Sequence, residues 1–149
     1  MDSGVDTGLH EIFIHVKDPD NETIHPEVLM EDNQSTTLWD SVYLPLDFQQ
    51  LISAQVIVLP RSTGDLRWNI STAWGKLCAD EDYNQHTDSI AATETAVTDN
   101  KLSCVDISAA FTGVAAGDLI GFQFTREGGD VGDTLNAECA YLGARIRYV

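Results

Sequence analysis

The tryptophans and tyrosines are the side chains in this sequence most suited to binding a ligand by stacking. Five of them could form a platform for sugar rings: Trp39, Trp68, Trp74, Tyr43 and Tyr83. Trp68 shares the alternation of Leu66 and Ile70, which favours a place in the core. Trp39 alternates with the apolar positions of its own segment and is the better surface candidate. Trp39 and Trp74 are therefore the candidate sugar-stacking residues.

Two arginines near the C-terminus are candidates for contact with another protein. Arg145 and Arg147 lie two residues apart, so a strand places both on the face opposite Ala144, Ile146 and Tyr148. They either pair with carboxylates of this chain or neutralise acids of another subunit or of a capsid.

No motif predicts catalysis, and we expect no catalytic residue, metal or cofactor. The sequence has no nucleophile elbow, and no Gly-rich loop leads from a strand into a helix. The four histidines lack the helical spacing that places two imidazoles on one metal. Acidic residues 18–22 lack the Gly and Glu of an EF-hand loop, so this segment and residues 80–82 are interpreted as solvated turns rather than irregular calcium sites. The chain is predicted not to be an enzyme.

The charge balance excludes several kinds of partner. The chain has 24 acidic and 8 basic residues and a net charge of −16, which disfavours nucleic acid and anionic membranes. The first 50 residues hold 11 acids and only Lys17 as a base. No signal peptide is expected, and Cys78, Cys104 and Cys139 are expected to be buried or half-buried free thiols.

Alternating apolar residues predict strands throughout. The expected strands are 12–16, 37–44, 50–59, 66–74, 87–97, 101–107, 119–125 and 138–149. The Thr-rich segment 87–97 is expected at a sheet edge, and the last strand alternates through Ala140, Leu142, Ala144, Ile146 and Tyr148. Residues 17–34 are expected to be a loop crossing between sheets, with short helical turns at 47–50 and 108–111. The prediction is one all-β domain over residues 1–149, an antiparallel β-sandwich that is jelly-roll-like with about eight strands.

From about Val42 onward, the order of short motifs resembles jelly-roll modules of tailed-phage virion proteins. The matching segments are 43–48 (YLPLDF), 56–59 (VIVL), 66–70 (LRWNI), 106–107 (DI), 116–120 (AGDLI), 124–127 (FTRE), 133–135 (DTL), 140–143 (AYLG) and 147–148 (RY). The first 40 residues, an acidic strand and long loop, lie outside the resemblance.

This resemblance implies a non-enzymatic head decoration (cement) protein. Such a protein is made in the host cytoplasm and binds the major capsid protein on the outer surface of the virion, where it stabilises the head. It is expected to be a homotrimer. The short chain favours this role over that of a tail-fibre module. The alternative is a carbohydrate- or receptor-binding module of a tail fibre or spike, which requires Trp39 or Trp74 to be exposed. A third hypothesis, a small hydrolase, requires carboxylates or histidines clustered in a cleft.

Overall fold

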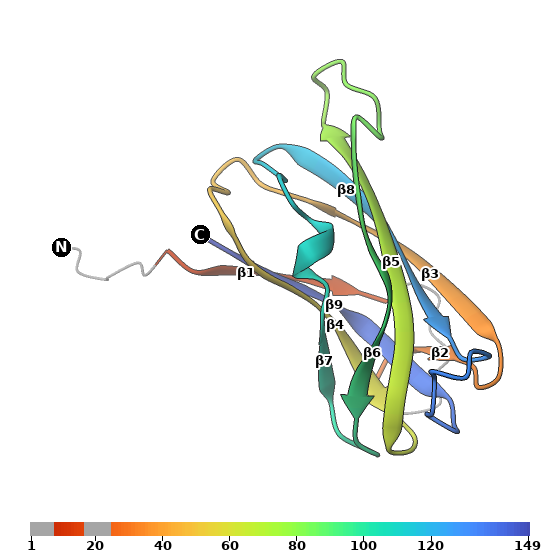
Figure 1. The fold of residues 1–149 in the computed structure, drawn as a ribbon. Coiled ribbons are helices and arrows are strands. Elements are labelled where there is room, and N and C mark those ends of the chain that lie inside the picture. Colours follow the sequence, from red (N-terminus) through yellow and green to blue (C-terminus); the bar gives the residue numbers. More distant parts are fainter. Residues whose placement is uncertain (1–7, 17–24) are drawn as a thin grey trace, which may run out of the picture.

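Two antiparallel sheets pack face to face in the computed structural model, which describes residues 8–16 and 25–149 (Figure 1). The first sheet has the order β1 (His10–His15), β9 (Cys139–Tyr148), β4 (Leu51–Pro60), β7 (Ser103–Asp106), with β2 (Val28–Met30) also paired to β9. The second sheet has the order β3 (Ser35–Tyr43), β8 (Asp118–Glu127), β5 (Gly64–Lys76), β6 (His86–Val97). The described residues thus form nine strands and one 3-10 turn, η1 (Ser108–Ala110).

The strand pairing has a nested order. Strand β1 pairs with β9, β3 with β8, β4 with β7 and β5 with β6, so the chain is one long hairpin. Rolling that hairpin up brings β4 against β9 and β5 against β8. Eight strands arranged in this way in two sheets form a jelly roll. The predicted all-β sandwich with jelly-roll topology is confirmed, and the edge position of β6 is confirmed as well.

The core lies between the sheets and follows the alternation of the strands. Trp68 and Ile70 of β5 and Phe124 of β8 are buried there, and the rings of Trp68 and Phe124 stack at a centroid distance of 5.5 Å. These residues are buried because successive side chains in a strand point to opposite faces of its sheet. The predicted core position of Trp68 is confirmed.

The last strand departs from the predicted alternation. Ile57 pairs with Gly143 and Val58 with Tyr141, which leaves Leu142 as an extra, bulged residue of β9. The bulge reverses the faces on either side of it, so Ala144 and Ile146 belong to the main core. Ala140 and Leu142 instead form a separate cluster with Leu59. The prediction of one continuous face from Ala140 to Tyr148 is therefore wrong.

Three smaller predictions are corrected or confirmed by the structure. The described part of the expected loop 17–34 contains β2, whose residues pair with β9, whereas residues 17–24 lie outside the described residues. Residues 47–50 form no helix, because the chain turns only at residues 46–47. The 3-10 turn predicted near residue 108 is confirmed.

The cysteines are also partly different from expectation. Cys139 is buried, and burial raises the pKa of its thiol to about 12. Cys78, in the turn after β5, and Cys104, on β7, are exposed, so the expectation of a buried or half-buried thiol is wrong for both.

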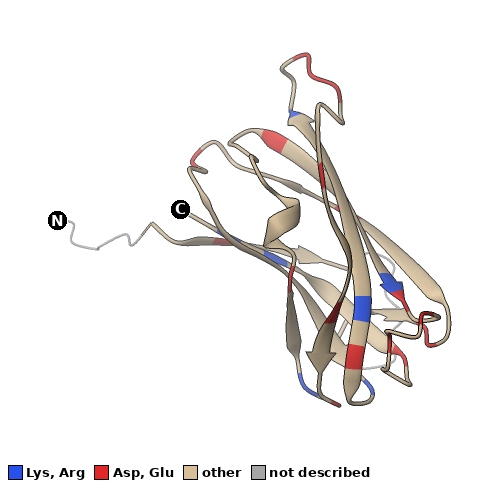
Figure 2. Cartoon of the chain, viewed as in Figure 1, with Lys and Arg blue, Asp and Glu red and all other residues tan. Residues whose placement is uncertain are grey.

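The two central strands of the second sheet are uncharged in their middle segments. Segments 69–75 of β5 and 119–125 of β8 carry no charged residue, whereas the loop between β5 and β6 is acidic (Figure 2). No helix formed by the described residues has the length and apolarity needed to span a bilayer.

Candidate functional site

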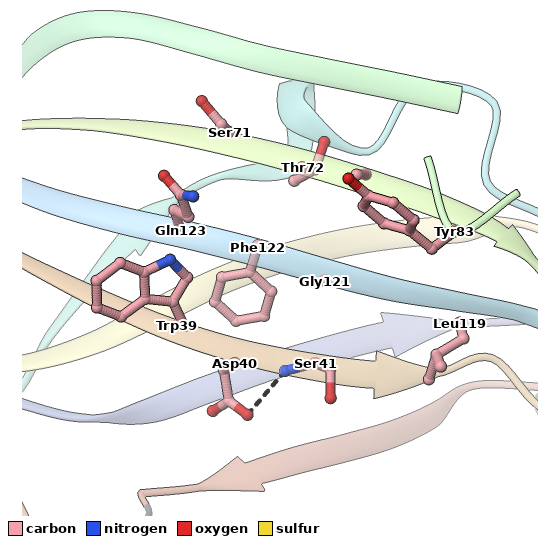
Figure 3. Close-up of a pocket in the computed structure, with 11 residues that line it drawn as sticks. Trp39, Asp40, Ser41, Ser71, Thr72, Tyr83, Leu119, Gly121, Phe122 and Gln123 are labelled. Atoms are coloured by element: carbon pink, nitrogen blue, oxygen red, sulfur yellow. Dashed lines mark hydrogen bonds between the residues drawn. The ribbon is translucent and has the colours of Figure 1, made fainter. Parts of the chain in front are cut away.

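A pocket of about 380 Å³ opens on the outer face of the second sheet (Figure 3). We call it the Trp39 pocket. Its lining comes from β3, β5, β8 and the loop that leads into β6: Trp39, Asp40, Ser41, Ser71, Thr72, Ala73, Tyr83, Leu119, Gly121, Phe122 and Gln123. The pocket therefore depends on three neighbouring strands that are far apart in the sequence.

Two cross-strand rows of residues form the floor of the pocket, and only the first consists of small residues. Ser41 of β3 pairs with Gly121 of β8, which pairs with Ala73 of β5. In the next row Trp39 pairs with Gln123, and Gln123 pairs with Ser71. The depression exists because the first row carries almost no side-chain volume, whereas Trp39 rises beside it.

Gly121 is not required by the backbone of β8. It is absent from the residues with positive φ, and a Cβ atom built there would have only the Ala73 carbonyl oxygen near it, at 4.0 Å. At Gly75 a Cβ atom would instead lie 2.2 Å from the carbonyl oxygen of Asp82. Glycine weakens a strand and often marks the close approach of a ligand. Glycine at position 121 therefore leaves the floor of the pocket open and is not needed for the fold.

Two exposed aromatic rings flank this floor. Trp39 is 69% exposed and Tyr83 is 81% exposed. The two side chains lie on opposite sides of Gly121 (Figure 3). This arrangement gives the pocket two apolar surfaces with a polar edge on each ring.

The loop of residues 77–85 holds Tyr83 in place. The backbone N–H of Lys76 donates to Oε1 of Glu81 at 2.7 Å, and the N–H of Gln85 donates to the carbonyl of Asp82 at 3.0 Å. Gly75 allows the Asp82 carbonyl to lie directly against the strand. The loop is thus folded back on β5, which brings Tyr83 into the lining of the pocket.

The pocket is polar without being cationic. Ser41, Ser71 and Gln123 offer hydroxyl and amide groups on the outer face. Asp40 is the one charged residue among those that line the pocket, but its side chain lies on the face of β3 opposite Trp39 and Ser41. Its Oδ1 accepts a hydrogen bond from the N–H of Ser41 at 2.8 Å. Such a lining can orient an uncharged polar ligand by hydrogen bonds.

The two tryptophans proposed from the sequence have different positions. Trp39 is exposed, as expected for a surface candidate. Trp74 is only 2% exposed and stacks on His86 at a centroid distance of 5.8 Å. The prediction that Trp74 is available for stacking is wrong, because its even offset from Trp68 places it on the core face of β5.

Arg145 and Arg147 lie on the opposite side of the sandwich. Nε of Arg147 is 2.8 Å from Oε1 of Glu11, and Nη2 of Arg145 is 2.6 Å from Oε1 of Gln55. Both arginines therefore contact residues of their own chain. Their role in binding another protein stays a prediction.

Potential metal ligands are dispersed in the part of the chain that the structure describes. No group of three or more His, Cys, Asp or Glu side chains there could hold a metal ion, the acidic segment 80–82 included. The acidic segment 18–22 lies outside the described residues.

The fold and the pocket together define a β-sandwich with an aromatic-walled pocket on one sheet. No protein-family model and no curated protein matches the sequence. The solved structure of TmCBM61 in complex with β-1,4-galactotriose is similar over 82% of this chain and 69% of that chain, with 12% identity and a TM-score of 0.39. A likeness this distant carries no argument about function, and the resemblance to phage virion modules stays a prediction.

Proposed function

We propose that the protein is a non-catalytic carbohydrate-binding module that holds a short oligosaccharide in the Trp39 pocket. The observation that carries this proposal is the floor at Gly121, which is free of side chains and lies between two exposed aromatic rings. A pocket of about 380 Å³ is within the range of small-molecule sites.

The chemistry of the lining suits a sugar. A pyranose ring has an apolar face of C–H groups, which stacks on Trp39 or Tyr83, and a rim of hydroxyl groups. Ser41, Ser71 and Gln123 can donate to and accept from those hydroxyl groups. Tryptophan and tyrosine supply much contact area with little loss of side-chain entropy. The pocket thus matches both parts of the ligand.

Calorimetric titration with a panel of oligosaccharides tests the proposal. We expect saturable binding of at least one β-1,4-linked tetrasaccharide of glucose, mannose, galactose or xylose. Gly121→Val fills the floor while favouring the strand, so it should weaken that binding at least tenfold with no loss of thermal stability.

Thr125→Val is the matched control, because Thr125 lies on the outer face of the same strand and does not line the pocket. It should bind as the unmodified chain does. The proposal fails if no member of the panel binds at millimolar concentration, or if Gly121→Val binds normally.

The decoration function is a second candidate, favoured by a different surface. Phe13 and Leu102 are 44% and 62% exposed and line a hollow of the first sheet together with Ile57 and Leu142. Arg145 pairs with Phe13 across the strands, so cationic and apolar groups share one face. Such a face suits contact with an acidic, partly apolar protein surface, as a homotrimer on the major capsid protein would require.

Phage heads that lack decoration protein test this second candidate. We expect the purified protein to bind them in a saturable manner, and electron microscopy to place it on the outer surface of the capsid. Arg145→Glu combined with Phe13→Ser should remove this binding without changing oligosaccharide affinity. Absence of binding at every salt concentration would exclude the role.

A further inference from the structure

We infer that the Trp39 pocket selects uncharged oligosaccharides and rejects those that carry carboxylates, such as uronic acid chains. This inference rests on the proposed function and adds the ligand class to it. The loop that carries Tyr83 is the element that we expect to cause the rejection.

The loop that carries Tyr83 is strongly acidic. Asp80, Glu81 and Asp82 directly precede Tyr83, all three are exposed, and the loop stands out as acidic (Figure 2). No Lys or Arg occurs among the residues that line the pocket, and the carboxylate of Asp40 lies on the other face of β3 from Trp39 and Ser41. A ligand that stacks on Tyr83 therefore has acidic residues beside it and no cationic group in the lining.

The nearest basic residue at this end of β5 is engaged elsewhere. Nζ of Lys76 donates to the carbonyl of Ala116 at 2.9 Å and lies 3.7 Å from Oδ1 of Asp118. Sites that recognise carboxylates normally use Arg or Lys in charge-assisted hydrogen bonds. The Trp39 pocket offers no such group from its lining residues.

The acidic loop is held close to the ligand position. Glu81 is bonded to the backbone of Lys76, and the Asp82 carbonyl packs against Gly75, so the loop cannot swing away without breaking these contacts. A sugar stacked on Tyr83 lies within a few residues of three carboxylates. Glu81 and Asp82 line the hollow next to the Trp39 pocket, and Tyr83 and Leu119 line both. Repulsion between an anionic sugar and carboxylates nearer than the Debye length of about 8 Å at physiological salt is only partly screened.

Matched pairs of ligands test the inference. The β-1,4-linked tetrasaccharides of glucose, mannose and galactose are titrated beside counterparts with the same linkage in which C6 is a carboxylate. At 20 mM NaCl we expect the neutral member of each binding pair to bind at least tenfold more tightly. The ratio should shrink at 500 mM NaCl and in the double variant Asp80→Asn, Asp82→Asn.

A charge-matched control separates a local effect from the effect of the net charge. Asp65→Asn with Asp99→Asn removes two acids near the opposite end of the β5–β6 hairpin and should leave the ratio unchanged. Equal or tighter binding of the acidic members, or an equal response to both double variants, would overturn the inference and leave the proposed function intact. If no tetrasaccharide of either kind binds, the proposed function itself fails.

Discussion

Replacing Trp39 with alanine is expected to remove most oligosaccharide binding while leaving the fold intact. The indole is 69% exposed and rises beside the floor of the Trp39 pocket, so its loss removes ligand contact rather than core packing. A central aromatic residue of a binding site typically contributes about 2 kcal/mol or more, which corresponds to roughly a 30-fold loss of affinity. Exposed substitutions usually change the free energy of unfolding by less than about 0.5 kcal/mol.

Calorimetry and tryptophan fluorescence measure this effect independently. Trp68 and Trp74 are 3% and 2% exposed, so a change in emission on addition of ligand should come from Trp39. The change should disappear in Trp39→Ala together with the binding heat. Leu102→Ala, which alters an exposed residue lining the hollow of the first sheet, should retain both signals. Normal affinity of Trp39→Ala would show that the ligand does not stack on this ring.

Alternation along single strands predicts which face of its strand several of the pocket residues occupy. The period-two pattern places Leu119, Gly121 and Gln123 on one face of β8, and it separates Trp39 from the apolar residues of β3. Each of these assignments needs only the sequence of one strand. The shared face of Gly121 and Gln123, and the separation of Trp39 from the apolar side of its strand, therefore follow from the sequence. The structure shows that both faces are on the outside of the sandwich.

The assembly of the site cannot be predicted in the same way. Ser41, Gly121 and Ala73 form one row only because β8 lies between β3 and β5 in this register. Register is fixed by pairing between segments that are distant in the sequence. The position of Tyr83 depends in addition on the loop contact at Gly75, and no periodic signal marks such a contact.

Arg126 shows how a strand boundary hides a buried charge. The alternation of Ile120, Phe122 and Phe124 continues to residue 126, but an expected end at Thr125 leaves the arginine outside the strand. The structure extends β8 to Glu127, and Arg126 is fully buried. Its partner Asp133 lies at the end of the Gly-rich segment 128–133 that follows β8. Oδ1 of Asp133 accepts a hydrogen bond from the N–H of Leu135, which is the local turn that Asp side chains favour.

Replacing Arg126 with methionine is expected to cause the largest loss of stability of any single substitution considered. The guanidinium forms two hydrogen bonds with the Asp133 carboxylate, at 3.0 and 3.1 Å. Its other donors bind the carbonyl oxygens of Met30, Leu135 and Ala137 at 2.7 to 2.9 Å. Removing one member of a buried pair leaves an uncompensated charge and typically costs about 3–5 kcal/mol. For a domain of this size, that corresponds to a fall in Tm of roughly 10 °C.

A partly exposed arginine of the other sheet provides the comparison. Arg145 is partly exposed and bonded to Gln55, so Arg145→Met should cost less than about 1 kcal/mol. Chemical denaturation of both variants measures the difference. Arg126 joins Asp133, in the turn after β8, to Met30, which precedes β3. None of these residues lines the Trp39 pocket, so folded Arg126→Met should still bind oligosaccharide with normal affinity. Equal stability of the two variants would mean that the Arg126–Asp133 pair does not stabilise this turn. Loss of binding by folded Arg126→Met would show that the turn and the pocket are coupled.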